Sequence, residues 1–107
     1  MILVSISILE VMQTELEDIL NGCKEQNEKS QDLLYSRYSS LFFAICLRYL
    51  KDREDAEDLL HDSFIKIFDK INSFSGEGSF EGWMKRILVN NCLNYLKDKK
   101  KVLKIEN

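Results

Sequence analysis

Residues 52–71 have the sequence DREDAEDLLHDSFIKIFDKI and predict one amphipathic helix. Its apolar side chains recur every three or four residues, which places them on one face of a helix. The Asp52 carboxylate can cap the free N–H groups of the first turn, and the acids that follow are favoured there by the helix dipole. One face is therefore expected to pack, and the other to display Asp55, Asp58, His61, Asp62 and Lys66.

Two further long helices are predicted, one on each side of this segment. One is predicted from about Glu28 to Leu50, and one from a Ser79 cap to about Lys99. A short helix from about Glu15 to Cys23 precedes them. The expected core positions of the two longer helices are Leu33, Leu34, Tyr38, Leu41, Phe42, Ile45 and Tyr49, then Phe80, Met84, Ile87, Leu88, Leu93 and Leu96.

The composition favours an all-α fold. The 107 residues are 45% hydrophobic with no proline and four glycines, which leaves little turn chemistry for strands. We expect a compact bundle of about four helices in one domain. Residues 1–13 are interpreted as an N-terminal extension, 14–101 as the helical domain and 102–107 as a C-terminal tail that starts a linker.

Charge is distributed unevenly along the chain. Residues 1–82 carry 8 Lys and Arg against 16 Asp and Glu, whereas residues 83–104 carry 7 against 1. Such a division predicts two different partners, one basic and one polyanionic.

The cysteines and the N-terminal stretch indicate the cellular compartment. Cys23, Cys46 and Cys92 show no disulfide or zinc spacing, which indicates a reduced, cytoplasmic protein. Residues 1–12 are apolar but shorter than the roughly 20 residues of a spanning helix. No membrane partner is expected, although a membrane-surface protein anchored by residues 1–12 is an alternative.

No catalytic constellation is visible, so the chain is predicted not to be an enzyme and to need no cofactor or metal. His61 lies beside Asp58 and Asp62, and a solvated trio is favoured over a metal site. Gly76 and Gly78 precede a helix, but they lack the strand and the Lys-Ser/Thr pair of a phosphate loop.

The helix after Ser79 has the chemistry of a nucleic-acid surface. It combines cations for phosphates, amides that can read base edges, and aromatic rings that can stack on unpaired bases. A core role for the two aromatic residues is the alternative. The residues are Trp83, Lys85, Arg86, Asn90, Asn91, Asn94, Tyr95 and Lys97.

Four runs in this order resemble region 2 of bacterial sigma factors of the extracytoplasmic-function group, and the similarity covers about residues 15–101. They are LYSRY at 34–38, CLRYL at 46–50, DREDAEDLLHDSF at 52–64 and FSGEGSFEGWMKRILVN at 74–90. The resemblance implies a non-enzymatic transcription-initiation module.

The same resemblance implies a polymerase-binding surface. In the family, an acidic helix binds the clamp helices of the polymerase β′ subunit, and the expected residues here are Asp55, Asp58, His61 and Asp62. The family commonly has glutamine where this chain has His61. A neutral imidazole still accepts or donates one hydrogen bond, so docking is expected to persist with some pH sensitivity.

The resemblance also implies a second surface, for the non-template single strand of the minus-ten promoter element. Phe74 and Asn90 are expected to line a pocket for a flipped base, with Lys85, Arg86 and Asn94 on the backbone or neighbouring bases. Trp83 is placed at the melting junction, with a buried structural role as the alternative.

Two further expectations concern the whole protein. An anti-sigma factor is an additional partner that the family suggests. The alternative function is a truncated interaction module, a decoy that binds polymerase or an anti-sigma protein without opening DNA. The family's second domain, which reads the minus-thirty-five element, has no counterpart before Asn107.

Overall fold

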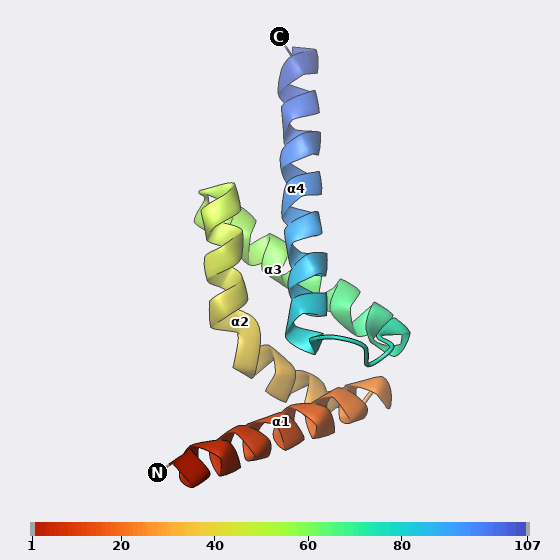
Figure 1. Ribbon diagram of the computed structural model, residues 1–107. Helices are drawn as coiled ribbons and strands as arrows, with labels where there is room; N and C mark the ends of the chain where they lie inside the picture. Colours follow the sequence, from red (N-terminus) through yellow and green to blue (C-terminus); the bar gives the residue numbers. More distant parts are fainter. Residues whose placement is uncertain (1, 107) are drawn as a thin grey trace. The chain divides into compact units, whose positions relative to one another are not determined.

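The computed structural model describes the backbone of residues 2–106 and the side chains of residues 7–103. The chain forms α1 (Ile2–Lys24), α2 (Glu28–Leu50), α3 (Arg53–Lys70), the 3₁₀ turn η1 (Ile71–Ser73) and α4 (Phe80–Glu106) (Figure 1). No strand occurs within residues 2–106. The prediction of an all-α fold with about four helices is confirmed. The chain divides into two units, Met1–Arg37 and Tyr38–Asn107.

The first unit is a helix pair joined by a tight turn. Gln26 adopts a left-handed conformation with φ of 61°, and the Ser30 amide donates to Asn27 Oδ1 at 3.0 Å at the start of α2. Gly22 touches the Ser30 side chain so closely that any Cβ would displace it. The sequence therefore needs glycine where these two helices meet.

Helix α1 begins at Ile2, which is 13 residues before the predicted start near Glu15. Residues 2–14 contain no proline or glycine, so nothing in the chain interrupts a helix that starts early. The assignment of residues 1–13 as an extension stays a prediction, and the side chains of residues 1–6 lie outside the described part.

In the second unit, local capping sets where the helices start. Asp52 Oδ1 accepts a hydrogen bond from the Asp55 amide at 2.9 Å, and Ser79 Oγ accepts one from the Gly82 amide at 3.1 Å. Both predicted caps are confirmed. Gly76 and Gly78 have φ values of 86° and 77°, so the loop before α4 uses the conformational freedom that only glycine supplies without strain.

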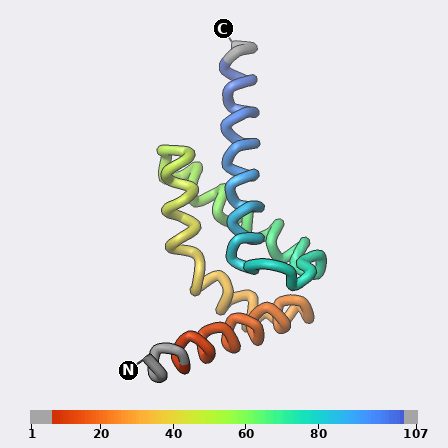
Figure 2. Tube along the Cα trace, viewed as in Figure 1, coloured from red at the N-terminus to blue at the C-terminus, as the bar shows by residue number. Residues whose placement is uncertain are grey.

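The core of the second unit is built where α2, α3 and α4 meet. Helix α3 packs against α4 (Figure 2). The Cys92 thiol of α4 contacts the Cys46 thiol of α2 with 4.0 Å between the sulfurs. The buried side chains follow lines of three- and four-residue spacing on each helix. They include Tyr38, Phe42, Cys46, Leu50, Ala56, Leu60, Phe64, Ile67, Met84, Leu88 and Cys92.

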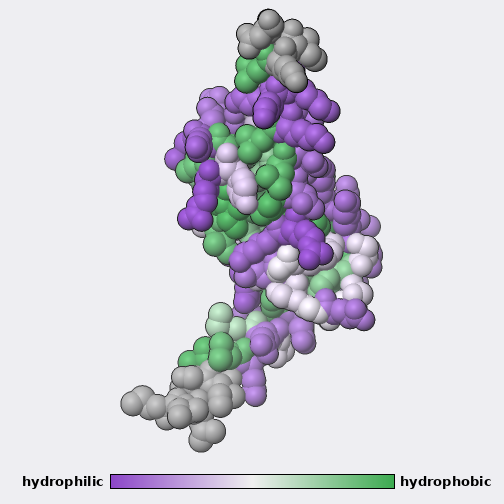
Figure 3. Space-filling view, turned by 45° about the horizontal axis from the view of Figure 1, so that its top comes forward, coloured by the Kyte–Doolittle hydropathy of each residue, from purple (hydrophilic) through white to green (hydrophobic). Residues whose placement is uncertain are grey.

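The buried line on α2 is narrower than the sequence predicts. It runs through every fourth residue from Leu34 to Leu50, while Leu33, Leu41 and Tyr49 stay exposed. On α4, Leu93 is 50% exposed because it is one residue past Cys92 and turns out of the interface. The prediction that Leu33, Leu41, Tyr49 and Leu93 belong to the core was wrong. Figure 3 shows an apolar patch among hydrophilic side chains on the face that it draws.

Helix α4 continues to Glu106, seven residues beyond the predicted end near Lys99. The four lysines at 97 and 99–101 favour a helix C-terminus but do not stop the helix, because lysine is a good helix former. Among the described residues, no helix combines the length and apolar character that crossing a membrane requires.

Candidate functional site

The outward side of α3 displays a cluster that we call the acidic face, formed by Asp58, His61, Asp62 and Ile65. Spacings of three and four residues place these side chains together, and all four are exposed. Ile65 is 58% exposed, with acids one and two turns before it. Sequence reasoning missed Ile65, although its spacing from Asp58 and Asp62 already placed it on their face.

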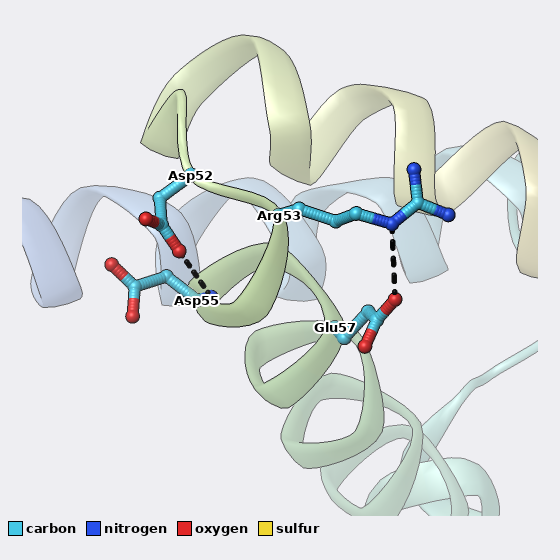
Figure 4. A network of polar contacts seen from close by, with 4 residues as sticks. All are labelled: Asp52, Arg53, Asp55 and Glu57. Atoms are coloured by element: carbon cyan, nitrogen blue, oxygen red, sulfur yellow. Dashed lines mark hydrogen bonds and ion pairs between the residues drawn. The ribbon is translucent and has the colours of Figure 1, made fainter.

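The acids around this face differ in how far their charge is neutralised. Glu57 pairs with Arg53 at 3.5 Å (Figure 4), and Asp55 pairs with Lys99 of α4 at 3.7 Å. Within residues 7–103, neither Asp58 nor Asp62 forms an ion pair. These two carboxylates are therefore available to a basic partner.

Asp55 lies at the edge of α3 that faces α4. Its side chain is hydrogen-bonded by the Tyr95 hydroxyl, which raises the pKa of Tyr95 above its ordinary value because the neutral phenol is the donor. The Lys99 ammonium is also 5.9 Å from the Tyr95 ring centre. Thus the structure brings Asp58, His61 and Asp62 together and ties Asp55 to α4.

Four of the six predicted DNA-binding residues form a line on α4, which we call the α4 stripe. Its members are Trp83, Arg86, Asn90 and Asn94, spaced by three, four and four residues. The last three are exposed and Trp83 is half-buried. Lys85 is separated from Arg86 by about 100° around the helix axis. Its ammonium is 3.1 Å from Glu81, so Lys85 stands apart from the stripe.

Phe74 and Trp83 belong to an aromatic cluster at the start of α4. The ring centres of Phe74 and Trp83 are 5.5 Å apart, and the Phe80 ring lies 5.3 Å from Phe74 and 5.8 Å from Trp83. Phe74 is only 7% exposed, so its ring is part of the packed cluster. Trp83 contacts the buried Phe74 ring and is also the first member of the stripe, and because it is half-buried it offers the more accessible surface for stacking.

Asn90 and Asn91 have different roles although they are adjacent. Asn90 is exposed on the stripe, whereas Asn91 is 7% exposed and bonds to Ser63 and Lys66 of α3. No group of three or more metal-ligating side chains is found in the described part of the chain. The geometry thus defines a helical module with an acidic face on one helix and a polar, cationic stripe on the next.

Residues 34–102 match the Sigma-70 region 2 family. The chain belongs to this family. The resemblance inferred from the sequence is confirmed by this match and by the relatives that follow.

Curated relatives include the ECF RNA polymerase sigma-E factor of Haemophilus influenzae, 37% identical over 87 residues, which cover 79% of this chain and 46% of that protein. The RNA polymerase sigma-H factor of Pseudomonas aeruginosa is 25% identical, with 78% and 44% covered. The chain therefore spans about half the length of these relatives. A solved complex of an engineered region 2 of sigmaE with GTAAAA is similar with a TM-score of 0.75 and 27% identity, covering 82% of this chain and 92% of that one.

Proposed function

We propose that this domain binds the RNA polymerase core through the acidic face and holds the unpaired minus-ten strand of a promoter on the α4 stripe. The observation that carries the proposal is the pairing of these two surfaces on packed helices of one unit. A protein that must bind polymerase and DNA at once needs surfaces that do not overlap. The acidic face and the α4 stripe meet that requirement.

The acidic face has the chemistry for a basic protein partner. Asp58 and Asp62 are exposed and form no ion pair among residues 7–103, and Ile65 supplies an exposed apolar side chain beside them. Charge complementarity steers association and sets register, while a desolvated apolar side chain adds affinity. The family resemblance names the partner as the clamp helices of the polymerase β′ subunit.

The α4 stripe has the chemistry for a single strand. Arg86 offers a cation for phosphates, the amides of Asn90 and Asn94 can read base edges, and Trp83 can stack on a base. The similar region 2 of sigmaE was solved with the oligonucleotide GTAAAA, which supports a role in DNA binding. Taking a base out of the stack costs a few kcal/mol, which stacking and hydrogen bonds must offset.

The test uses fluorescently labelled single-stranded GTAAAA, the oligonucleotide of the sigmaE complex, and the same sequence within a duplex. We expect the chain to bind the single strand at least about tenfold more tightly, and Asn90→Ala to lose about tenfold, the value of one or two hydrogen bonds. The matched control is Asn21→Ala, an exposed asparagine of α1. Equal affinity for single strand and duplex, or equal effects of the two variants, would contradict the DNA half of the proposal.

The alternative is a module that binds polymerase, or an anti-sigma factor, without opening DNA. It predicts polymerase binding that Asp58→Arg abolishes, together with no preference for single-stranded over duplex DNA. The two functions therefore differ in the oligonucleotide measurement alone.

A further inference from the structure

Ser63 and Asn91 are the polar side chains buried among the described residues, and they bond to each other between α3 and α4. The Asn91 Nδ2 amide donates to Ser63 Oγ at 3.0 Å, and Asn91 Oδ1 accepts from the Lys66 ammonium at 2.6 Å. We call Ser63, Lys66 and Asn91 the inter-helix network. It connects the two helices that carry the acidic face and the α4 stripe.

The network is satisfied as it stands. No buried side-chain nitrogen or oxygen in the described residues lacks a hydrogen-bond partner. An apolar pair of the same size would pack at this place without needing any hydrogen bond, so stability alone does not require polar residues here. A buried polar network raises the free energy of every arrangement of α3 and α4 that breaks its hydrogen bonds.

This free-energy penalty depends on the rotation of α4 about its own axis. A turn by one residue position would carry Asn91 about 100° away from Ser63 and Lys66. Lys66 and the buried Ser63 hydroxyl would then each lose the bond to Asn91. Apolar neighbours such as Met84 and Leu88 discriminate less, because dispersion and hydrophobic contacts have little directionality.

Rotation of α4 decides where the α4 stripe points. Asn90 and Asn91 are adjacent in one rigid helix. The hydrogen bonds of Asn91 therefore set the direction in which Asn90 points. Lys66 takes part from the α3 side, one residue after Ile65 of the acidic face. The network is thus placed to fix the two surfaces relative to each other.

We propose that Asn91 is a positioning residue: through Ser63 and Lys66 it fixes the rotation of α4 on α3, and thereby the presentation of Arg86, Asn90 and Asn94 to DNA. The DNA consequence rests on the proposed function, whereas the rotational consequence does not. Asn91 itself contacts no DNA in this account, since it is buried between the helices.

Rotation is measured with spin labels on Asp69→Cys of α3 and Leu93→Cys of α4, two exposed positions outside the network. The three native cysteines are buried, so labelling is confined to the introduced thiols. Asn91→Leu keeps the size and removes both bonds, and we expect the label distance distribution to shift or broaden. Asn91→Asp accepts from both the Lys66 ammonium and the Ser63 hydroxyl, and we expect it to keep the native distribution.

A second variant covers the case in which Asn91→Leu does not fold. Ser63→Ala removes one partner and leaves the Lys66 bond, so we expect a smaller broadening of the same distribution. An unchanged distribution in a folded Asn91→Leu, or in Ser63→Ala if Asn91→Leu does not fold, would overturn the proposal.

Affinity for single-stranded GTAAAA tests the DNA consequence. We expect Asn91→Leu to lose about tenfold, comparable to one misplaced contact, and Asn91→Asp to stay within about twofold of the native chain. A shifted label distance with native affinity would overturn the link to DNA. If the native chain does not bind the oligonucleotide, the proposed function fails on this probe, while the label distances still decide whether Asn91 sets the rotation.

Discussion

The Lys99 ammonium of α4 lies 3.7 Å from the Asp55 carboxylate of α3. Tyr95 donates to the same carboxylate, so Asp55 has two partners within the domain. Asp58 and Asp62, about one and two turns further along α3, have no ion pair among residues 7–103. The carboxylates predicted to bind polymerase are therefore not equivalent: Asp55 is paired within the domain, whereas Asp58 and Asp62 form no ion pair among residues 7–103.

This difference predicts unequal effects of neutralising each acid. We expect Asp58→Asn to weaken binding to core RNA polymerase by about tenfold or more, because a charge-assisted contact is lost. Asp55→Asn should cost less than about threefold, since its charge is already compensated. Fluorescence anisotropy of the labelled domain measures both, with circular dichroism as the folding control. Equal losses would show that Asp55 faces the polymerase after all.

Trp83 provides an intrinsic signal for DNA binding, because it is the single tryptophan of the chain. We expect single-stranded GTAAAA to change Trp83 fluorescence on binding, as a base stacks on the exposed part of the ring.

Phe74→Ala should lower the free energy of unfolding by about 3 kcal/mol, the usual cost of deleting a buried phenyl ring. If Phe74→Ala instead leaves stability unchanged and removes only DNA binding, its ring contacts a base rather than the cluster.

Salt dependence separates the two neighbouring cations of α4. Arg86 lies on the α4 stripe, whereas Lys85 is paired with Glu81 at 3.1 Å. Arg86→Ala should therefore reduce the slope of log affinity against log salt by about 0.7, the value for one phosphate contact on a single strand. Lys85→Ala should change that slope by clearly less. A larger effect of Lys85 would mean that its pair with Glu81 opens on DNA.

Much of the fold could be predicted because it depends on local chemistry. Asp52 and Ser79 cap α3 and α4 as expected, and two glycines take positive φ in the loop between them. Helix lengths were harder: nothing in residues 2–14 or after Lys99 opposes a helix, and sequence patterns detect stop signals better than continuation. Which of two adjacent apolar lines is buried depends on the partner helix, so Leu41 and Leu93 were misassigned.

The candidate site divides in the same way. Helical spacing correctly gathers Asp58, His61 and Asp62, and it gathers Arg86, Asn90 and Asn94. It does not reveal that Asp55 is held by Lys99, a residue 44 positions away, because that contact exists only after α3 packs on α4. The contrast between exposed Asn90 and buried Asn91 likewise needs the structure.

The buried thiols predict a loss of stability at alkaline pH. Burial raises the pKa of Cys46 to about 12 and that of Cys92 above its ordinary value, so above pH 9 their thiols titrate first in the unfolded chain. The unfolded state then binds fewer protons, and the free energy of unfolding should fall as pH rises from 9 toward 12, by up to about 1.4 kcal/mol per pH unit from Cys46, with a further loss in the same direction from Cys92. Denaturant titrations of the native chain and of Cys46→Ala/Cys92→Ala measure this. The slopes should differ, and identical slopes would contradict the account.

We propose that the acidic face and the α4 stripe are separate surfaces with different partners. The most direct measurement compares core polymerase binding and single-stranded GTAAAA binding in Asp58→Arg, with the helical circular-dichroism signal as a control. We expect polymerase binding to be abolished by charge reversal, while affinity for the oligonucleotide stays within about threefold of the native value. Retained polymerase binding, or a parallel loss of both activities in a folded variant, would contradict the claim.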